Sequence, residues 1–540
     1  MLKILESLGS IWSWVEGKLL WGLVLFTVYV SIILFLRMRK AIVFDPWMNL
    51  SQETPPDLGK GLADLLLFKI REIQNIHQKC IGQIGLWTPY HDVPVFQQDL
   101  DEDLRLLSSF DLGSGGEKTG KVMMFLFRLI RLMFQPTKLK GSIHQYGNDV
   151  LLQVTLERFK NQASGPRGTQ VWYAKGKSAA PEQFPELVEE IAYQIYVELV
   201  GSSLFKSWRS FRDYTNGLEH YLAHKDIGKK KDLAAAQSLY QKALDEEPNN
   251  PAVCYNLGVL KYFSYEQEEN EEAIEYFREA VLSGDPDLRV RAHSGLANAL
   301  VQQYSRYCAG DANTPGEAIL HAEQAIAIDP SSDVANKALG FAYHQQSEVD
   351  GLNEHTANQY RELAKTHYEK AFTRNPKYYE AYNNLGNLYL GWADKPPKGK
   401  RAERLAKAIK MCERALGVEP TYRLAYDNIG NAYFKLKNFC EAERYYKLAL
   451  QYYPGYPEAI NDLAMLYLTA GFPDRNFSQA LTLHNQALSK PKLKETQKKK
   501  LCRAFHKSIN SEPGSPDQFK LNPRLVESLQ KSDCSCVPAV

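Results

Sequence analysis

The sequence predicts a mainly α-helical protein, in which a helical-repeat solenoid follows a small α/β domain and one transmembrane helix. Three observations predict this fold class. Eighteen residues without a charge lie between Lys18 and Arg37. Residues 41–205 mix the alternating apolar pattern of strands with the wider spacing of helices. From about Asp213 onward, alanines recur in pairs seven residues apart, most with a proline close behind.

The uncharged run, residues 19–36, is long enough to cross a membrane as a helix. At about 1.5 Å per residue it spans about 27 Å, close to the ~30 Å hydrocarbon core of a bilayer. A cleaved signal peptide needs a small-residue cleavage site, whereas this run ends in Arg-Met-Arg-Lys, residues 37–40. We therefore expect a retained single-pass membrane anchor at residues 19–36, which follows an amphipathic segment at residues 1–18. The net positive charge follows the run, which favours a cytoplasmic C-terminal part.

Composition gives no support for a nucleic-acid partner, a metal or a cofactor. The 65 basic and 63 acidic side chains nearly cancel, so bulk charge favours neither nucleic acid nor an acidic ligand. The eight cysteines are scattered, which is typical of a reducing compartment rather than of a disulfide framework. His220 and His224 are four residues apart, but no third ligand accompanies them, which favours a surface pair. We predict no metal site and no cofactor.

The segment Gly115–Val122, GGEKTGKV, matches the first part of a phosphate-binding loop. That loop needs a Ser or Thr hydroxyl to hold Mg²⁺, and Val122 occupies this position. The residues before it are acidic and mixed, whereas a buried apolar strand is required. A nucleotide-binding enzyme that uses residues 115–122 is therefore only our third hypothesis, and we predict no catalytic residue.

Residues 41–205 are predicted to form the α/β domain. A hairpin is expected around Tyr146–Asp149, because Gly-Asn suits the positive φ angles of a tight turn. Residues 150–156 alternate toward one face. Further elements are a strand at 41–50, a helix with Leu62, Leu65, Leu66, Ile70 and Ile73 in one stripe, a strand at 169–175 and a helix through Leu187, Ile191 and Ile195.

The order of these elements resembles the TolB-like N-terminal domain. Similar phrases occur at Ile42–Ser51, at the helix from Gly61, at Leu139–Ile143, at Gly147–Leu156 and at the strand-borne Trp172. The resemblance implies a non-catalytic interaction or ligand-sensing domain. Two features depart from the family pattern: its Pro-Phe is displaced to Asp45-Pro46-Trp47, and a long insertion covers residues 80–118.

The repeat region is predicted over residues 210–490. Members of each alanine pair are two helical turns apart, so both face the same way and let a neighbouring helix approach closely. A proline near each pair marks a helix end. The seven pairs are Ala236/Ala243, Ala273/Ala280, Ala318/Ala325, Ala364/Ala371, Ala408/Ala415, Ala442/Ala449 and Ala480/Ala487, and the prolines are Pro248, Pro286, Pro330, Pro376, Pro420, Pro454 and Pro491.

A second motif in each repeat pairs an aliphatic residue with Gly or Ala, as in Leu385-Gly386 and Ile429-Gly430. With Tyr389, the alanine pair and the proline, this motif resembles the tetratricopeptide repeat. The step from Pro420 to Pro454 is 34 residues, the period of that family. The resemblance implies about seven helical hairpins whose first helices line a concave groove for a protein or peptide partner.

Polar side chains recur beside the small residue of these first helices. An amide suits a peptide partner because it both donates and accepts hydrogen bonds. The likeness to the asparagine ladder of peptide-binding repeats makes these residues the candidate partner-binding site; solvated polar positions between repeats are the alternative. Candidates two residues before the small residue are Asn256, Asn384, Asn428 and Asp462, and those one residue after it are Asn298, Asn387 and Asn431.

The segment after the array is basic and then amphipathic. Residues 490–500 carry many lysines, and contact with anionic lipid is a possible role. We expect a capping helix at 491–510 and a disordered tail at 511–540.

These predictions give one leading function and one rival. The leading hypothesis is a non-catalytic adaptor, anchored in a bacterial inner membrane through residues 19–36, that binds a protein or peptide in the groove. The rival is a sensor, in which the α/β domain binds a small molecule and regulates the array.

Overall fold

The computed structural model describes the α/β region in pieces and the helical array almost continuously. The described ranges are 41–44, 48–49, 58–80, 88, 95–97, 137–146, 149–157, 170–177, 183–198 and, with gaps at 228–229, 265–266, 306–312, 396–397, 470–471 and 474–475, residues 204–489. Within these ranges, no helix has the length and apolar character needed to span a bilayer. The predicted anchor at 19–36, the loop at 115–122, the basic segment at 490–500 and the predicted cap and tail lie outside them.

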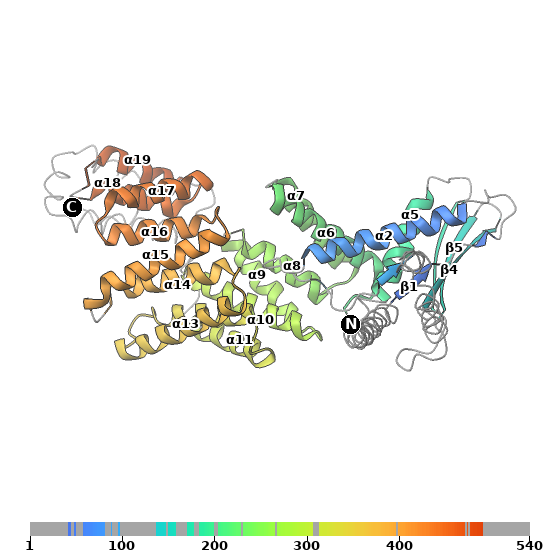
Figure 1. Cartoon of the computed structure of the whole chain (residues 1–540), viewed down its shortest axis with the longest axis horizontal. Helices are drawn as coiled ribbons and strands as arrows, with labels where there is room; N and C mark the ends of the chain where they lie inside the picture. The colour runs from blue at the N-terminus through green and yellow to red at the C-terminus, as the bar shows by residue number, and fades with distance from the viewer. Residues whose placement is uncertain are drawn as a thin grey trace, which may run out of the picture. The chain divides into compact units, whose positions relative to one another are not determined.

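The chain divides into two compact units (Figure 1). One ends at Glu247 and holds the sheet, its helices and the first helical hairpin; the other begins at Pro248 and holds the later hairpins. The predicted boundary between the α/β domain and the array lies instead between residues 205 and 210. The first hairpin therefore packs with the sheet unit, although its sequence carries the repeat pattern.

The sheet of the first unit has its long strands in an antiparallel run. β4 (Thr137–Tyr146), β5 (Asp149–Glu157) and β6 (Gln170–Lys177) pair antiparallel, so the predicted hairpin around residues 146–149 is confirmed. β1 (Ala41–Phe44) runs parallel to β4 and to β3 (Val95–Gln97), and β2 (Met48–Asn49) pairs with β4. Among the described strands the order is β3-β1-β4-β5-β6.

Helices α2 (Leu58–Cys80) and α5 (Phe184–Tyr196) lie side by side against the sheet (Figure 1). The alternating residues of β5 point toward this layer, and Leu152 and Val154 have no exposed surface. Leu66 and Ile70 of α2 and Ile191 of α5 are equally buried. The predicted apolar stripes of both helices therefore form the core of a two-layer α/β unit.

An aromatic cluster attaches the first hairpin, α6 (Trp208–Ile227) and α7 (Lys230–Glu246), to this unit. The His77 ring of α2 stacks at 5.3 Å on Phe211 and at 5.6 Å on Tyr196. Its Nε2 lies 3.1 Å from Thr215 Oγ1, and its Nδ1 contacts Thr88 Oγ1. Burial lowers the pKa of His77 to about 3, so the ring is neutral at pH 7.

The second unit continues the array as helical hairpins. With α6–α7, the described residues form seven hairpins, as many as there are alanine pairs. The helices of this unit are α8 (Pro251–Tyr262), α9 (Gln267–Ala280), α10 (Pro286–Ser305), α11 (Thr314–Ile328), α12 (Asp333–Gln346), α13 (Glu354–Arg374), α14 (Tyr379–Trp392), η4 (Lys398–Lys400), α15 (Arg401–Val418), α16 (Arg423–Lys435), α17 (Phe439–Tyr452), α18 (Pro457–Leu468) and α19 (Phe477–Leu488).

Small residues allow the two helices of a hairpin to approach closely. All fourteen paired alanines are buried, as the spacing predicts. A side chain on Gly430 of α16 would meet the Tyr446 ring of α17 at 2.6 Å, and one on Gly340 would meet Tyr368 at 2.9 Å. The glycine of the first helix thus leaves room for a large side chain four residues after the first alanine of the second helix.

The prolines separate hairpins, with one exception to the prediction. Pro248, Pro330, Pro376, Pro420 and Pro454 follow the ends of α7, α11, α13, α15 and α17 by two residues, and Pro491 lies outside the described residues. Pro286 instead begins α10, where its missing N–H costs no helical hydrogen bond. It marks a helix start, so its prediction as a helix end was wrong.

Candidate partner-binding site

The candidate site lies on the first helices of successive hairpins, here α12, α14, α16 and α18, which contact one another in sequence. Their polar side chains link neighbouring helices. Lys337 Nζ of α12 lies 3.0 Å from Glu380 Oε2 of α14, and their side chains are only 5% and 9% exposed. A nearly buried ion pair of this kind fixes one hairpin relative to the next, because both charges have lost their hydration and each would be left buried without a counter-ion if the hairpins separated.

Two of the predicted asparagines belong to the same ladder of contacts. Asn428 Nδ2 of α16 donates to Asn383 Oδ1 of α14 at 3.0 Å. Asn431 Nδ2 donates to Asp462 Oδ2 of α18 at 3.0 Å, and its Oδ1 accepts from the Tyr446 hydroxyl at 2.9 Å. Both functional atoms of the Asn431 amide are therefore occupied inside the array.

Asp462 sits in an unusual electrostatic environment. Burial raises the pKa of its carboxyl group to about 7, the Asn431 amide opposes this shift, and the nearby Glu458 carboxylate adds to it. The Asn431–Asp462 contact thus joins an amide to a carboxyl group that titrates near neutral pH. It is well suited to hold α16 against α18.

Asn384 and Asn387 of α14 differ from these residues. Asn384 is half-buried and Asn387 is exposed. Within the described part of the chain, neither side-chain amide makes a hydrogen bond. Because the two residues are three apart on one helix, their amides lie on neighbouring positions of the same surface.

The remaining two candidates are less accessible. Asn256 of α8 has no exposed surface, so its amide cannot reach a partner in this conformation. Asn298 of α10 is half-buried, and its Oδ1 is a buried acceptor without a hydrogen bond among the described residues. Of the seven predicted residues, Asn384 and Asn387 present their amides most openly.

The sequence also contains a pattern that indicates the polar contacts between first helices and that was not among the predictions. A polar residue recurs three positions before the small residue of four successive first helices: Lys337, Asn383, Asp427 and Asn461. All four are buried. Asn461 Oδ1 lies 2.8 Å from His484 Nδ1 of α19, so this column also binds within the array.

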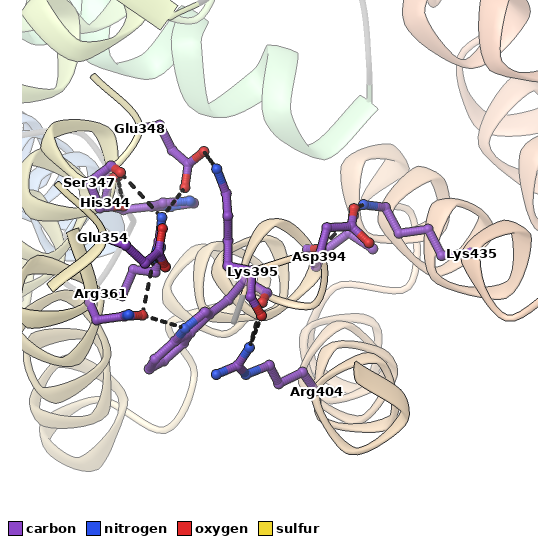
Figure 2. Close-up of polar contacts among 12 residues, drawn as sticks. His344, Ser347, Glu348, Glu354, Arg361, Asp394, Lys395, Arg404 and Lys435 are labelled. Atoms are coloured by element: carbon purple, nitrogen blue, oxygen red, sulfur yellow. Dashed lines mark hydrogen bonds and ion pairs between the residues drawn. The ribbon is translucent and has the colours of Figure 1, made fainter. Parts of the chain in front are cut away.

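A second polar network joins three hairpins near the loop before α15 (Figure 2). Its centre is Arg361 of α13, which is 1% exposed. Its guanidinium donates to Glu354 Oε1 at 2.8 Å, to Asn358 Oδ1 at 3.1 Å and to the Ser347 carbonyl at 3.4 Å. The Trp392 indole donates to the same Asn358 oxygen at 3.0 Å, which connects α13 to α14.

Arg404 extends the network into α15. It donates to the carbonyls of Trp392 and Lys395, both at 2.8 Å, and lies 4.8 Å over the Trp392 ring. Lys435 of α16 contacts Asp394 in the same loop (Figure 2). The cationic side chains of this network bind carboxylates and backbone carbonyls of the same chain. The network therefore holds the long inter-helical loop in place.

A sequence model of a known family matches one segment of the array. Residues 425–456 match the sequence model of the tetratricopeptide repeat, so the α16–α17 segment is such a repeat and the array is a tetratricopeptide-like solenoid. No curated protein matches the chain in sequence.

Several solved structures are similar to the chain at low identity. The thermophilic tetratricopeptide protein TTC0263 of Thermus thermophilus is 17% identical, with 48% of this chain and 99% of that chain covered and a TM-score of 0.29. The structure titled as the functional characterization of Pseudomonas aeruginosa pilF is 18% identical, with 46% and 97% covered and a TM-score of 0.29. A repeat protein from Parabacteroides merdae is 15% identical, with 55% and 99% covered and a TM-score of 0.35.

Proposed function

We propose that this protein is a membrane-anchored scaffold that binds a protein or peptide through the first-helix face of its solenoid. Asn384 and Asn387 support this proposal. Their amides lie three residues apart on α14, while Asn428 and Asn431 in the next hairpin bind within the array. An open amide can donate to and accept from one peptide unit of a partner backbone. The neighbouring first helices α12 and α16 are fixed to α14 by the Lys337–Glu380 and Asn428–Asn383 contacts, which keeps the open amides in a rigid surface.

The anchor at residues 19–36 would keep this face near a bacterial inner membrane, with the array on the cytoplasmic side. Attachment raises the local concentration of the scaffold around a membrane-associated partner without any additional contact. The TolB-like resemblance of residues 41–205 would add a second interaction module. Function in this proposal is binding alone, with no catalysis and no cofactor.

The test compares two double variants of the full chain in cells. Asn384→Ala with Asn387→Ala removes the open amides; Gln451→Ala with Gln479→Ala removes two exposed amides from second helices as a matched control. Crosslinking followed by mass spectrometry should recover one dominant partner with the wild type and the control, and lose it with the α14 variant. Equal recovery from all three would show that α14 is not the binding site.

Anchoring is tested separately by extraction. Full-length protein should remain in the membrane fraction after treatment with alkaline carbonate, whereas a variant without residues 1–40 should be released. Release of both forms would contradict the anchor and would leave the partner-binding proposal untouched.

A further inference from the structure

Two helices of the array carry exposed faces of opposite charge. α9 contains six glutamates and one arginine, so its net charge is −5. Residues 400–418, which are Lys400 and α15, contain six basic residues and two glutamates, so their net charge is +4. These totals stand out because the whole chain is nearly neutral.

The α9 charges form one stripe on the helix surface. We define the acidic stripe as Glu268, Glu271, Glu272, Glu275 and Glu279, all of which are exposed. Their spacing of three and four residues places them on adjacent turns of one face. Leu282, which is 75% exposed, follows the last of them by three residues.

The α15 charges form a matching stripe. We define the basic stripe as Lys400, Lys407, Lys410 and Arg414, all exposed. Val418, 38% exposed, follows the last of them by four residues. The basic steps 407–410–414 repeat the acidic steps 272–275–279, so two such helices laid alongside each other would pair these three glutamates with these three cations and bring Leu282 close to Val418.

We propose that the basic stripe on α15 binds the acidic stripe on α9 of a second copy of this chain. A second copy is the occupant that the chain itself supports, because it carries a complementary stripe with the same spacing. Leu282 and Val418, at the ends of the two stripes, add an apolar contact between the two copies. A charged lipid headgroup surface offers no apolar partner of this kind. The stripes lie on second helices, whereas Asn384 and Asn387 lie on the first helix α14.

The contribution of each charge pair is modest. Some stripe residues already have partners: Glu272 lies 2.9 Å from Lys261, and Lys407 lies 2.6 Å from Glu403. Exposed pairs are also screened over about 10 Å at 0.1 M salt. The association is therefore reversible and depends on salt, and we expect it to weaken about tenfold or more between 50 mM and 500 mM NaCl.

The experiment is sedimentation velocity of the full chain in non-ionic detergent at both salt concentrations. Glu275→Lys with Glu279→Lys reverses the end of the acidic stripe, and Lys410→Glu with Arg414→Glu reverses the end of the basic stripe. None of these four residues takes part in a buried ion pair among the described residues. Each variant alone should lose association at 50 mM NaCl, and circular dichroism should show that it remains helical.

Recombination of the variants distinguishes specific pairing from an effect of net charge. A mixture of the two variants should associate again, because one still has its acidic stripe and the other its basic stripe. A chain with all four reversals should also self-associate. Lys370→Glu with Arg374→Glu, on the exposed surface of α13, is the matched control and should behave as the wild type.

Three results would overturn the proposal. The wild type could stay monomeric at 50 mM NaCl. The α13 control could lose association as fully as the stripe variants. The mixture could fail to recover association while the α15 variant alone loses binding to phosphatidylglycerol vesicles, which would assign the basic stripe to a lipid surface.

Discussion

Replacement of Gly386 by alanine tests the close approach of helices within a hairpin. Gly386 lies in α14, and an added Cβ would overlap Cys412 Sγ of α15 and lie 3.1 Å from the Ala408 carbonyl and 3.4 Å from the Cys412 amide nitrogen. Two of these three atoms are backbone, so they cannot move without shifting α15. Gly391, near the end of the same helix, has no such neighbour within 4 Å and provides the matched control.

The expected change in free energy follows from two opposing effects. Alanine in place of glycine stabilises a helix by about 0.5–1 kcal/mol. Overpacking of a filled site costs about 1–3 kcal/mol, and the backbone contacts place Gly386 at the upper end. Gly386→Ala should therefore destabilise the α14–α15 hairpin by about 2 kcal/mol, whereas Gly391→Ala should leave it unchanged or stabilise it by up to about 1 kcal/mol.

Hydrogen exchange read by mass spectrometry measures this locally, which matters because a repeat array need not unfold as one unit. Peptides from α14 should exchange about thirtyfold faster in Gly386→Ala, since each 1.4 kcal/mol is a factor of ten. Adding Cys412→Ala should recover part of the protection, because the overlapping sulfur is gone. Equal protection in Gly386→Ala and Gly391→Ala would refute the close-approach argument.

Three further predictions concern buried titratable side chains. Glu380→Leu should lower the stability of the array to urea by about 3–5 kcal/mol, because Lys337 is left buried without its counter-ion; adding Lys337→Met should recover most of this loss. Arg361→Lys should speed amide exchange in α13 about tenfold, because one ammonium cannot replace the fork that binds Glu354 and the Ser347 carbonyl together. As the pH falls from about 6.5 toward 3, the first unit should lose up to about 1.4 kcal/mol per pH unit through His77, because the unfolded state then binds a proton that the folded state excludes. In His77→Gln, the protection of the α2 amides against hydrogen exchange should therefore decrease less steeply as the pH falls.

Each of these predictions has an outcome that contradicts it. Failure of Lys337→Met to improve the Glu380→Leu chain would mean that the pair is not energetically coupled. Unchanged exchange in Arg361→Lys would show that the network of Figure 2 tolerates any cation. An identical acid slope in wild type and His77→Gln would mean that His77 takes up its proton in the folded state.

Local sequence pattern was sufficient to predict most of the described helices and strands and much of the core. The alanine pairs gave the second helix of each hairpin, and all fourteen alanines are buried, since a seven-residue step returns to the same helix face. The alternation from Val150 to Leu156 predicted the buried face of β5, because every second side chain of a strand points to the same face. Pro286 was misjudged because proline suits a helix start as well as the residue after a helix end.

The candidate site was less predictable, because the role of an amide depends on what lies opposite. Asn387 and Asn431 occupy the same position in successive repeats and look alike in sequence. Only the second faces a carboxyl group and a tyrosine hydroxyl, supplied by residues 31 and 15 positions further along the chain. The placement of α6–α7 with the sheet unit depends in the same way on His77, 134 residues before Phe211 in sequence.

The sequence by itself thus determined the seven hairpins, the long strands and helices of the α/β unit, and their buried faces, because each follows from periodicity within a single helix or strand. Strand β3 was missed, since it lies in the segment 80–118 that was predicted to be an insertion. The tertiary structure decided which polar groups are occupied and which stay open. Three sets of contacts form only when separate helices pack together: Lys337 with Glu380, the network around Arg361, and Asn431 with Asp462. A buried polar group is destabilising without a hydrogen-bond partner, so its energy depends on the residue that the neighbouring helix supplies.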